Sequence, residues 1–105
     1  MSAGEAARVS AETKRVVVEL FGAARKVAGV AEVELELALA ATVRDTMRAL
    51  AAIHSALSGT VIDPESCALK PHFFLNLDGR ETIREYDFAP RHGARLLLMS
   101  AIVGG

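Results

Sequence analysis

The residues with the clearest chemical use are the last two, Gly104 and Gly105. Two successive glycines form a thin backbone strip without side chains, which can enter a narrow active site and present its terminal carboxylate to an activating group. Because glycine makes up about 7% of average sequences, composition alone gives two terminal glycines a chance of about half a per cent. The pair, with Val103 before it, indicates a working C-terminal tail but does not name the function by itself.

Side-chain chemistry has weaker candidates, which are three histidines, one cysteine and a row of glutamates: His54, His72, His92, Cys67, Glu32, Glu34 and Glu36. The histidines lack metal-ligand spacing such as i, i+4, and we expect His54 to be a half-buried packing residue. No local motif marks Cys67 as a nucleophile, and alternate strand positions explain the glutamates as a solvated face. We therefore expect no metal site and no catalysis by this chain alone.

Composition restricts the class of protein further. The 105 residues predict one domain, and 51% hydrophobic with 24% charged residues is typical of a soluble globule. A formal net charge of −1 argues against a nucleic-acid partner, which needs a basic surface. No apolar stretch approaches the roughly 20 residues of a membrane span, and Met1 to Lys14 lacks a secretory hydrophobic region. We expect a cytoplasmic protein with no membrane partner.

The first half of the chain predicts a flexible extension over residues 1–13, a β-hairpin and a helix. Residues 15–21 are rich in β-branched side chains and predict a strand. Residues 22–29 predict a loop, and the strict alternation over residues 31–39 predicts the second strand. Thr42 and Asp45 form a capping-box pattern. The helix is expected to run to Ser58 with Gly59 as its cap, and its apolar stripe would be Val43, Met47, Leu50, Ile53 and Leu57.

The second half predicts a long connection over residues 59–71 and then three more strands. The third strand covers residues 72–77, a tight turn follows at Asp78-Gly79, and a short strand covers Glu81 to Ile83. Residues 95–103 form a final strand, whose continuous apolar run predicts a central place in the sheet. The expected order, β-β-α-β-β-β, is an α+β roll with one main helix on one face of the sheet.

Strand alternation also predicts a docking surface. Phe21, Leu97, Met99 and Ala101 fall on the positions that we assign to the face away from the helix. An apolar patch there, next to the tail, would bind a partner protein. The competing interpretation is that these four side chains belong to a second packing layer or are covered.

Four segments together resemble the ThiS/MoaD family of ubiquitin-like sulfur carriers, and among them the small subunits of molybdopterin synthases. VELFGAARKVAG is similar to the family's opening strand and loop, and AEVELELALAATVRDTMRALAAIHSAL to its second strand and helix. FLNLDGRE resembles the third strand and its turn, and LLLMSAIVGG the last strand and tail. The match covers residues 15–105, which we expect to form one sulfur-carrier domain starting at residue 14.

The resemblance implies a β-grasp fold with a mixed sheet and a reaction carried out by partners. An activating enzyme related to the ubiquitin E1 class would use ATP to adenylate the Gly105 carboxylate. Sulfur would then replace AMP and give a thiocarboxylate. A second enzyme, the large subunit of molybdopterin synthase or another sulfur acceptor, would take the sulfur. The chain itself would bind no cofactor.

Other functions stay open at this point. The acceptor pathway could instead be thiamin synthesis, tRNA thiolation, cysteine synthesis or secondary metabolism. The chain could be a protein modifier whose Gly105 is joined to substrate lysines. It could also be a non-covalent β-grasp interaction module, which would keep its activity after deletion of Gly104 and Gly105.

Overall fold

The computed structural model describes residues 12–101. The predicted tail residues Val103, Gly104 and Gly105 lie outside this range, as do residues 1–11 of the predicted extension. The elements are strand β1 (Thr13–Leu20), helix α2 (Gly22–Ala28), strand β2 (Glu32–Ala38), helix α3 (Val43–Ile53), the 3-10 turn η1 (Ser55–Leu57), and strands β3 (Phe73–Leu77), β4 (Glu81–Ile83) and β5 (Arg95–Ser100). Thr13 begins β1, so the first strand starts one residue before the predicted domain boundary.

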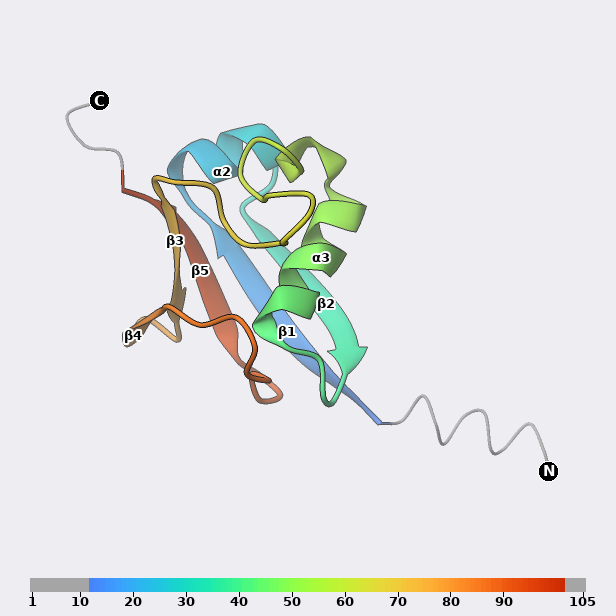
Figure 1. Ribbon diagram of the computed structural model, residues 1–105. Coiled ribbons are helices and arrows are strands. Elements are labelled where there is room, and N and C mark those ends of the chain that lie inside the picture. Colours follow the sequence, from blue (N-terminus) through green and yellow to red (C-terminus); the bar gives the residue numbers. More distant parts are fainter. Residues whose placement is uncertain (1–11, 102–105) are drawn as a thin grey trace.

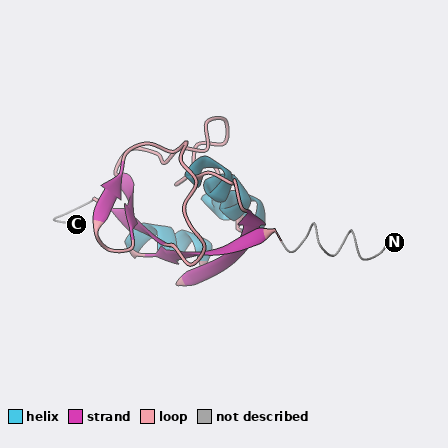
Figure 2. Cartoon of the chain, turned by 90° about the horizontal axis from the view of Figure 1, so that it is seen from below, coloured by secondary structure: helices cyan, strands magenta, loops and turns pink. Residues whose placement is uncertain are grey.

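The strands form one mixed sheet in the order β2-β1-β5-β3-β4. β1 and β5 run parallel, and the other neighbouring pairs are antiparallel. β5 therefore lies in the middle of the sheet, as its continuous apolar sequence predicts, and α3 crosses one face of the sheet (Figure 1). The view from below shows the strands as one curved layer, with α3 and the connecting loops on the same side (Figure 2).

The core lies between this face of the sheet and α3. Alternate residues of β1 and β5 are buried, among them Val16, Val18, Leu96 and Leu98. The alternation that predicted β2 corresponds to buried Val33 and Leu35 between exposed glutamates. The mixed sheet with a helix on one face confirms the predicted β-grasp, α+β arrangement.

Helix α3 begins as predicted and ends earlier. Thr42 Oγ1 accepts a hydrogen bond from the Asp45 N–H (3.1 Å), and Asp45 Oδ2 accepts one from the Thr42 N–H (2.9 Å), which completes the capping box. The helix stops at Ile53 with His54 as its C-cap, so the predicted end at Ser58 with a Gly59 cap is wrong. The predicted helix was too long because η1 follows α3 directly and buries Leu57, which therefore has the spacing of a further helix position.

One position of the predicted helix stripe is also wrong. Ile53 is 58% exposed, whereas Thr46 is fully buried. Thr46 occupies a core position because its hydroxyl donates to the Thr42 carbonyl (2.8 Å), which satisfies the side chain without a partner from the sheet. His54 is half-buried, as predicted.

The predicted loop over residues 22–29 is a seven-residue helix, α2. Ala24 on this helix is fully buried against the core. The helix ends at Gly29, whose backbone is left-handed (φ 80°) and whose N–H donates to the Arg25 carbonyl (2.8 Å). Such a C-cap favours glycine, which has no Cβ to strain. The fold therefore has a second short helix beside the one main helix that we predicted.

The remaining strands follow the prediction closely. β4 has the predicted bounds, and the long connection before β3 is held by the buried side chains of Val61 and Ile62. β5 ends at Ser100 instead of continuing through the predicted Ala101. Within residues 12–101, no helix has the length and hydrophobicity that a membrane span requires.

Candidate functional site

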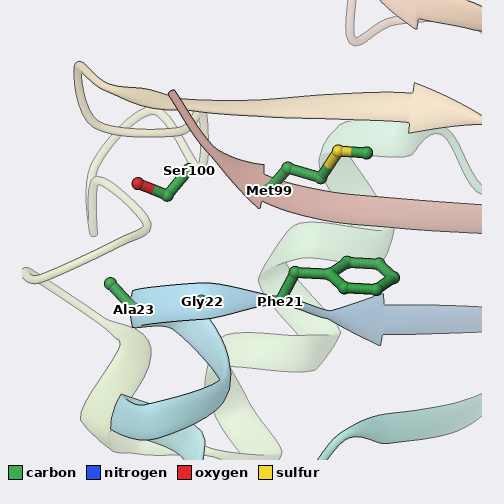
Figure 3. A pocket seen from close by; sticks show the side chains of 5 residues that line it. All are labelled: Phe21, Gly22, Ala23, Met99 and Ser100. Atoms are coloured by element: carbon green, nitrogen blue, oxygen red, sulfur yellow. The ribbon is translucent and has the colours of Figure 1, made fainter. Parts of the chain in front are cut away.

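The candidate site lies where the parallel strands β1 and β5 end. Leu20 pairs with Leu98 in this parallel register, and the Phe21 N–H donates to the Leu98 carbonyl (3.0 Å). Phe21 therefore follows the last paired residue of β1 and lies next to Met99. Their side chains lie alongside one another in Figure 3.

A hollow of about 450 Å³ opens at this place, lined by Phe21, Gly22, Ala23, Met99 and Ser100. Phe21 is 39% exposed and Met99 is partly buried. A Cβ placed on Gly22 would lie 3.8 Å from Ser100 Cβ, so the start of α2 packs closely against the end of β5. The hollow thus combines one exposed and one partly buried apolar side chain, Phe21 and Met99, with a close backbone approach. A hollow of this kind can receive a side chain or a peptide end of a partner protein.

The structure brings together two of the four predicted docking residues. Phe21 and Met99 line the hollow, whereas Leu97 and Ala101 do not. Leu97 is partly buried on the same outer face, since it alternates with buried Leu96 and Leu98. Ala101 is exposed, and its N–H donates to the His72 carbonyl (2.6 Å), which fixes the last described residue to the start of β3.

Another apolar side chain on this face comes from β3. Phe74 pairs with Met99 in the antiparallel register of β3 and β5, so the two side chains share the outer face, and Phe74 is partly buried. Phe74 was not among the predicted docking residues, which were taken from the first and last strands only. The docking surface, defined here as Phe21, Phe74, Leu97 and Met99, therefore spans three strands.

Gly22, Ala23 and Ser100 were not predicted as part of the hollow either. Gly22 and Ala23 were assigned to a loop, and only the helix α2 turns them toward β5. Ser100 follows Met99, so strand alternation assigns it to the opposite face and excludes it from the predicted docking residues.

The other end of the same face is charged. Arg95 forms ion pairs with Glu19 (3.0 Å) and Glu32 (3.5 Å), and Arg15 pairs with Glu34 (3.2 Å). The glutamates of β2 are exposed, as a solvated face predicts, and such exposed pairs contribute about 0–1 kcal/mol each. A partner would therefore meet an apolar region near Ser100 and a charged one near Arg95.

Hydrogen bonds anchor the beginning of β5. The Arg95 N–H donates to Asp78 Oδ1 (2.9 Å), and the Asp78 N–H donates to the Arg95 carbonyl (2.7 Å). The bond from the Arg95 backbone, helped by the Arg91 guanidinium, lowers the pKa of the Asp78 carboxyl below its usual value. The central strand is thus fixed at its start by the turn before β4 and at its end by His72.

Side-chain chemistry inside the described range is limited. Cys67 is buried as a free thiol, and residues 12–101 contain no group of three or more His, Cys, Asp and Glu side chains placed to hold a metal ion. The predicted chemical tail lies outside this range, and the candidate docking surface lies inside it.

A mixed five-stranded sheet, a helix across one face and an apolar hollow at the end of the central strand define a ubiquitin-like β-grasp protein. Solved structures place the chain more narrowly. Small archaeal modifier protein 1 (SAMP1) of Haloferax volcanii is 28% identical, aligns over 87% of this chain and 99% of its own, and has a TM-score of 0.75. No protein-family model and no curated protein sequence matches the chain.

Two further neighbours share the fold. A putative molybdopterin converting factor, subunit 1, of Pyrococcus furiosus is 24% identical, aligns over 85% of this chain and 99% of its own, and has a TM-score of 0.67. Ubiquitin of Caldiarchaeum subterraneum is 18% identical, aligns over 89% and 99%, and has a TM-score of 0.53. The predicted resemblance is confirmed, and the chain is similar to ubiquitin-like proteins of the sulfur-carrier or modifier type.

Proposed function

We propose that the chain is a sulfur carrier whose C-terminal Gly105 is adenylated by an E1-like enzyme and converted to a thiocarboxylate. The proposal takes Gly105 as the end of the chain. The carboxylate oxygen attacks the α-phosphorus of ATP and pyrophosphate leaves. Hydrosulfide from a donor then attacks the acyl carbon, the C–S bond forms, and AMP leaves. ATP belongs to the activating partner, and the carrier binds no cofactor of its own.

Activation is needed because a carboxylate is a poor electrophile. The acyl-adenylate supplies a good leaving group, and the thiocarboxylate that follows is a nucleophilic sulfur on a narrow tether. Gly104 and Gly105 suit this role since they add no side chain to the tether, with Val103 linking them to the domain. The fold's part is to bind the partner so that the tether enters its active site.

The observation that carries the proposal is the Gly104-Gly105 end on a ubiquitin-like β-grasp domain, a fold that the match to SAMP1 over 99% of that protein supports. The docking surface supports it, because exposed Phe21 and partly buried Met99 line a hollow at the end of β5, the last strand before Gly105 in the sequence. Exposed aromatic and methionine side chains around a hollow are typical of binding hot spots. We place the activating enzyme, and then the acceptor enzyme, on this surface. We expect both binding events to take place in the cytoplasm.

For the acceptor we propose the large subunit of molybdopterin synthase, so that the sulfur enters molybdenum cofactor synthesis. The sequence resemblance to the small subunits of this enzyme supports the choice, and the P. furiosus neighbour carries a corresponding name. Carriers for thiamin, tRNA thiolation or cysteine synthesis use the same first steps and differ only in the acceptor. Mixing the thiocarboxylate form with each candidate acceptor and following loss of sulfur would distinguish these pathways.

A second candidate function is protein modification, and the similarity to SAMP1, a small archaeal modifier protein, favours it. In this case the activated Gly105 carboxyl would form an isopeptide bond with a substrate lysine instead of accepting sulfur. Ladders of slower-migrating conjugates on denaturing blots would reveal it. A non-covalent β-grasp module would show neither ladders nor sulfur.

The decisive experiment measures the intact mass of the protein after incubation with ATP, a sulfur donor and the activating enzyme of its host. We expect a shift equal to one oxygen replaced by sulfur. The same chain without Gly105 should show no shift, although its fold is unchanged. No shift of the full chain with an enzyme of verified activity would overturn the carrier function and leave the protein modifier and the interaction module, which conjugate ladders distinguish.

A further inference from the structure

The chain has three lysines, Lys14, Lys26 and Lys70, and the structure makes them very different as nucleophiles. Lys14 is only 2% exposed, and its Nζ donates hydrogen bonds to the carbonyls of Ala41 and Pro90. An ammonium group held in this way has neither a free lone pair nor access to a large reagent. Lys14 is therefore closed to acylation in the folded protein.

Lys70 is partly accessible. Its residue is half-buried, its backbone N–H donates to the Val61 carbonyl (2.8 Å), and the rigid Pro71 follows it. Its charge lies near Asp63, where it helps to lower the pKa of that carboxyl after the stronger effects of the Glu65 and Ser66 backbone bonds. Lys70 is thus less accessible than a fully exposed lysine.

Lys26 combines exposure with a cavity. It is exposed on the last turn of α2, and its side chain makes no hydrogen bond or ion pair with another residue of the range 12–101. A hollow of about 510 Å³ opens beside it, lined by Gly22, Arg25, Lys26, Gly29, Val30 and Ala31. The volume lies inside the range of about 300–1,000 Å³ that is usual for small-ligand sites.

We infer that Lys26 is the lysine that accepts the activated Gly105 carboxyl group, from a second copy of this chain or from the same chain. The inference rests on the activation of Gly105 proposed above. The neutral Lys26 Nζ attacks the carbonyl carbon of Gly105, the new C–N bond forms, and the bond to the leaving group breaks. AMP, or a thiol when the tail is a thioester, leaves, and the lysine proton goes to the solvent.

The hollow fits the shape and charge of this tail. Gly22 and Gly29 give its wall no side chains, and a Cβ built on Gly29 would meet nothing within 4 Å, so a narrow strip of two glycines has room beside the lysine. Arg25 brings a permanent positive charge to the same wall, which attracts the anionic phosphate of an acyl-adenylate. Arg25 and Lys26 are adjacent, so the charge and the nucleophile enter the site together.

The experiment also shows whether the tail comes from the same chain or from a second copy. Gly22 lines this hollow and also the hollow next to Ser100, so α2 lies close to the end of β5 from which the chain continues. A tail from the same chain gives a cyclic monomer, and a tail from a second copy gives a branched dimer. The two products differ in mass, and both place the isopeptide bond on Lys26.

The test uses the full chain with an acetylated N-terminus and Gly105 prepared chemically as a thioester of mercaptoethanesulfonate, incubated near pH 8. Trypsin should then release the segment Leu96–Gly105 attached to Lys26, because Arg95 is the last basic residue before the tail. Lys26→Arg should reduce the conjugate at least about tenfold, because the guanidinium keeps the charge and is never deprotonated. Lys70→Arg is the matched control and should leave its yield unchanged.

Branching mainly at Lys70 or Lys14, or an unchanged yield in Lys26→Arg, would overturn the inference. Circular dichroism of each variant shows that its fold is kept, and Lys26 is exposed enough for the arginine to be accommodated. The thioester does not require the activating enzyme, so this result is independent of the proposed sulfur chemistry. Loss of thiocarboxylate formation with intact branching at Lys26 would contradict the carrier function alone.

Discussion

Phe21 and Met99 line the same hollow, Phe21 directly after β1 and Met99 on the neighbouring parallel strand β5 (Figure 3). Their side chains lie together because Leu20 pairs with Leu98, which puts the following residue of each strand on the outer face. An aromatic ring and a flexible thioether side by side form a surface that adapts to a partner. The region of the chain that we expect to contact the activating enzyme is therefore built from two distant parts of the sequence.

We predict that Phe21→Ala and Met99→Glu each weaken binding to the activating enzyme about tenfold or more, which corresponds to about 1.4 kcal/mol. Phe21→Ala removes an apolar anchor, and Met99→Glu buries a charge at the interface. Isothermal calorimetry with the purified enzyme measures the effect. Both side chains are partly exposed, so the melting temperature should change little.

Phe88→Ala is a matched control for this prediction. Phe88 is 38% exposed, almost the same as Phe21 at 39%, but it does not line the hollow. It should leave the affinity unchanged. Equal losses for Phe21→Ala and Phe88→Ala would show that general surface hydrophobicity, and not the hollow, determines binding.

The sequence was sufficient to predict elements with strong periodicity. β-Branched side chains predicted β1, alternation predicted β2, the apolar run predicted the central place of β5, and Thr42 with Asp45 predicted the start of α3. Helix α2 was not predicted, because seven residues give too few apolar repeats to separate a short helix from a loop. Its Ala24 becomes a core residue only through contact with distant strands.

The candidate site was partly predictable for the same reason. Strand parity placed Phe21 and Met99 on the outer face, and the structure brings both to one hollow. Parity could not exclude Leu97 from the lining or include Ser100, because the shape of the hollow depends on how α2 packs against β5. The role of Gly104 and Gly105 stays a prediction, since it depends on chemistry supplied by a partner.

The capping box of α3 gives a prediction about stability. Thr42→Ala removes the oxygen that accepts the Asp45 N–H bond and should cost about 1 kcal/mol of unfolding free energy. For a domain of this size the melting temperature should fall by about 4–8 °C. Thr42→Ser keeps the oxygen and should recover most of the loss. Calorimetric melting of the wild type and of both variants measures these losses. An equal loss in both variants would show that the Thr42 methyl group, not the cap, is responsible.

The lowered pKa of Asp78 predicts how the free energy of unfolding depends on pH. The Arg95 N–H bond, and then the Arg91 guanidinium, lower the pKa of Asp78 in the folded state. Its carboxylate therefore stabilises the fold fully above the unfolded pKa of about 4, and this contribution is lost as the pH falls through the lower folded pKa. Asp78→Asn should cost about 1 kcal/mol at pH 7 and progressively less on acidification toward pH 2.

Urea unfolding of the wild-type chain and of Asp78→Asn between pH 2 and pH 7 measures this difference. The asparagine tolerates the left-handed backbone at this position (φ 56°), so the comparison isolates the charge. Glu81→Gln, which removes an exposed carboxylate from neighbouring β4, is the control for the loss of one negative charge. A constant gap between Asp78→Asn and the wild type at every pH would refute the charge effect.

The buried Lys14 gives the last prediction. Its Nζ donates to the carbonyls of Ala41 (2.8 Å) and Pro90, and so ties β1 to the segments before α3 and before β5. Lys14→Met fills a similar volume but leaves both carbonyls without this donor, so the free energy of unfolding should fall by about 1–3 kcal/mol.

Burial lowers the pKa of Lys14, with the Asp45 charge partly opposing it. Between the folded pKa and about 10.4 the unfolded chain then holds more protons, so the stability of the wild type over Lys14→Met should rise with pH in this window. Urea unfolding at pH 7 and pH 10 measures both effects, and a gap that narrows at pH 10 would contradict the lowered pKa.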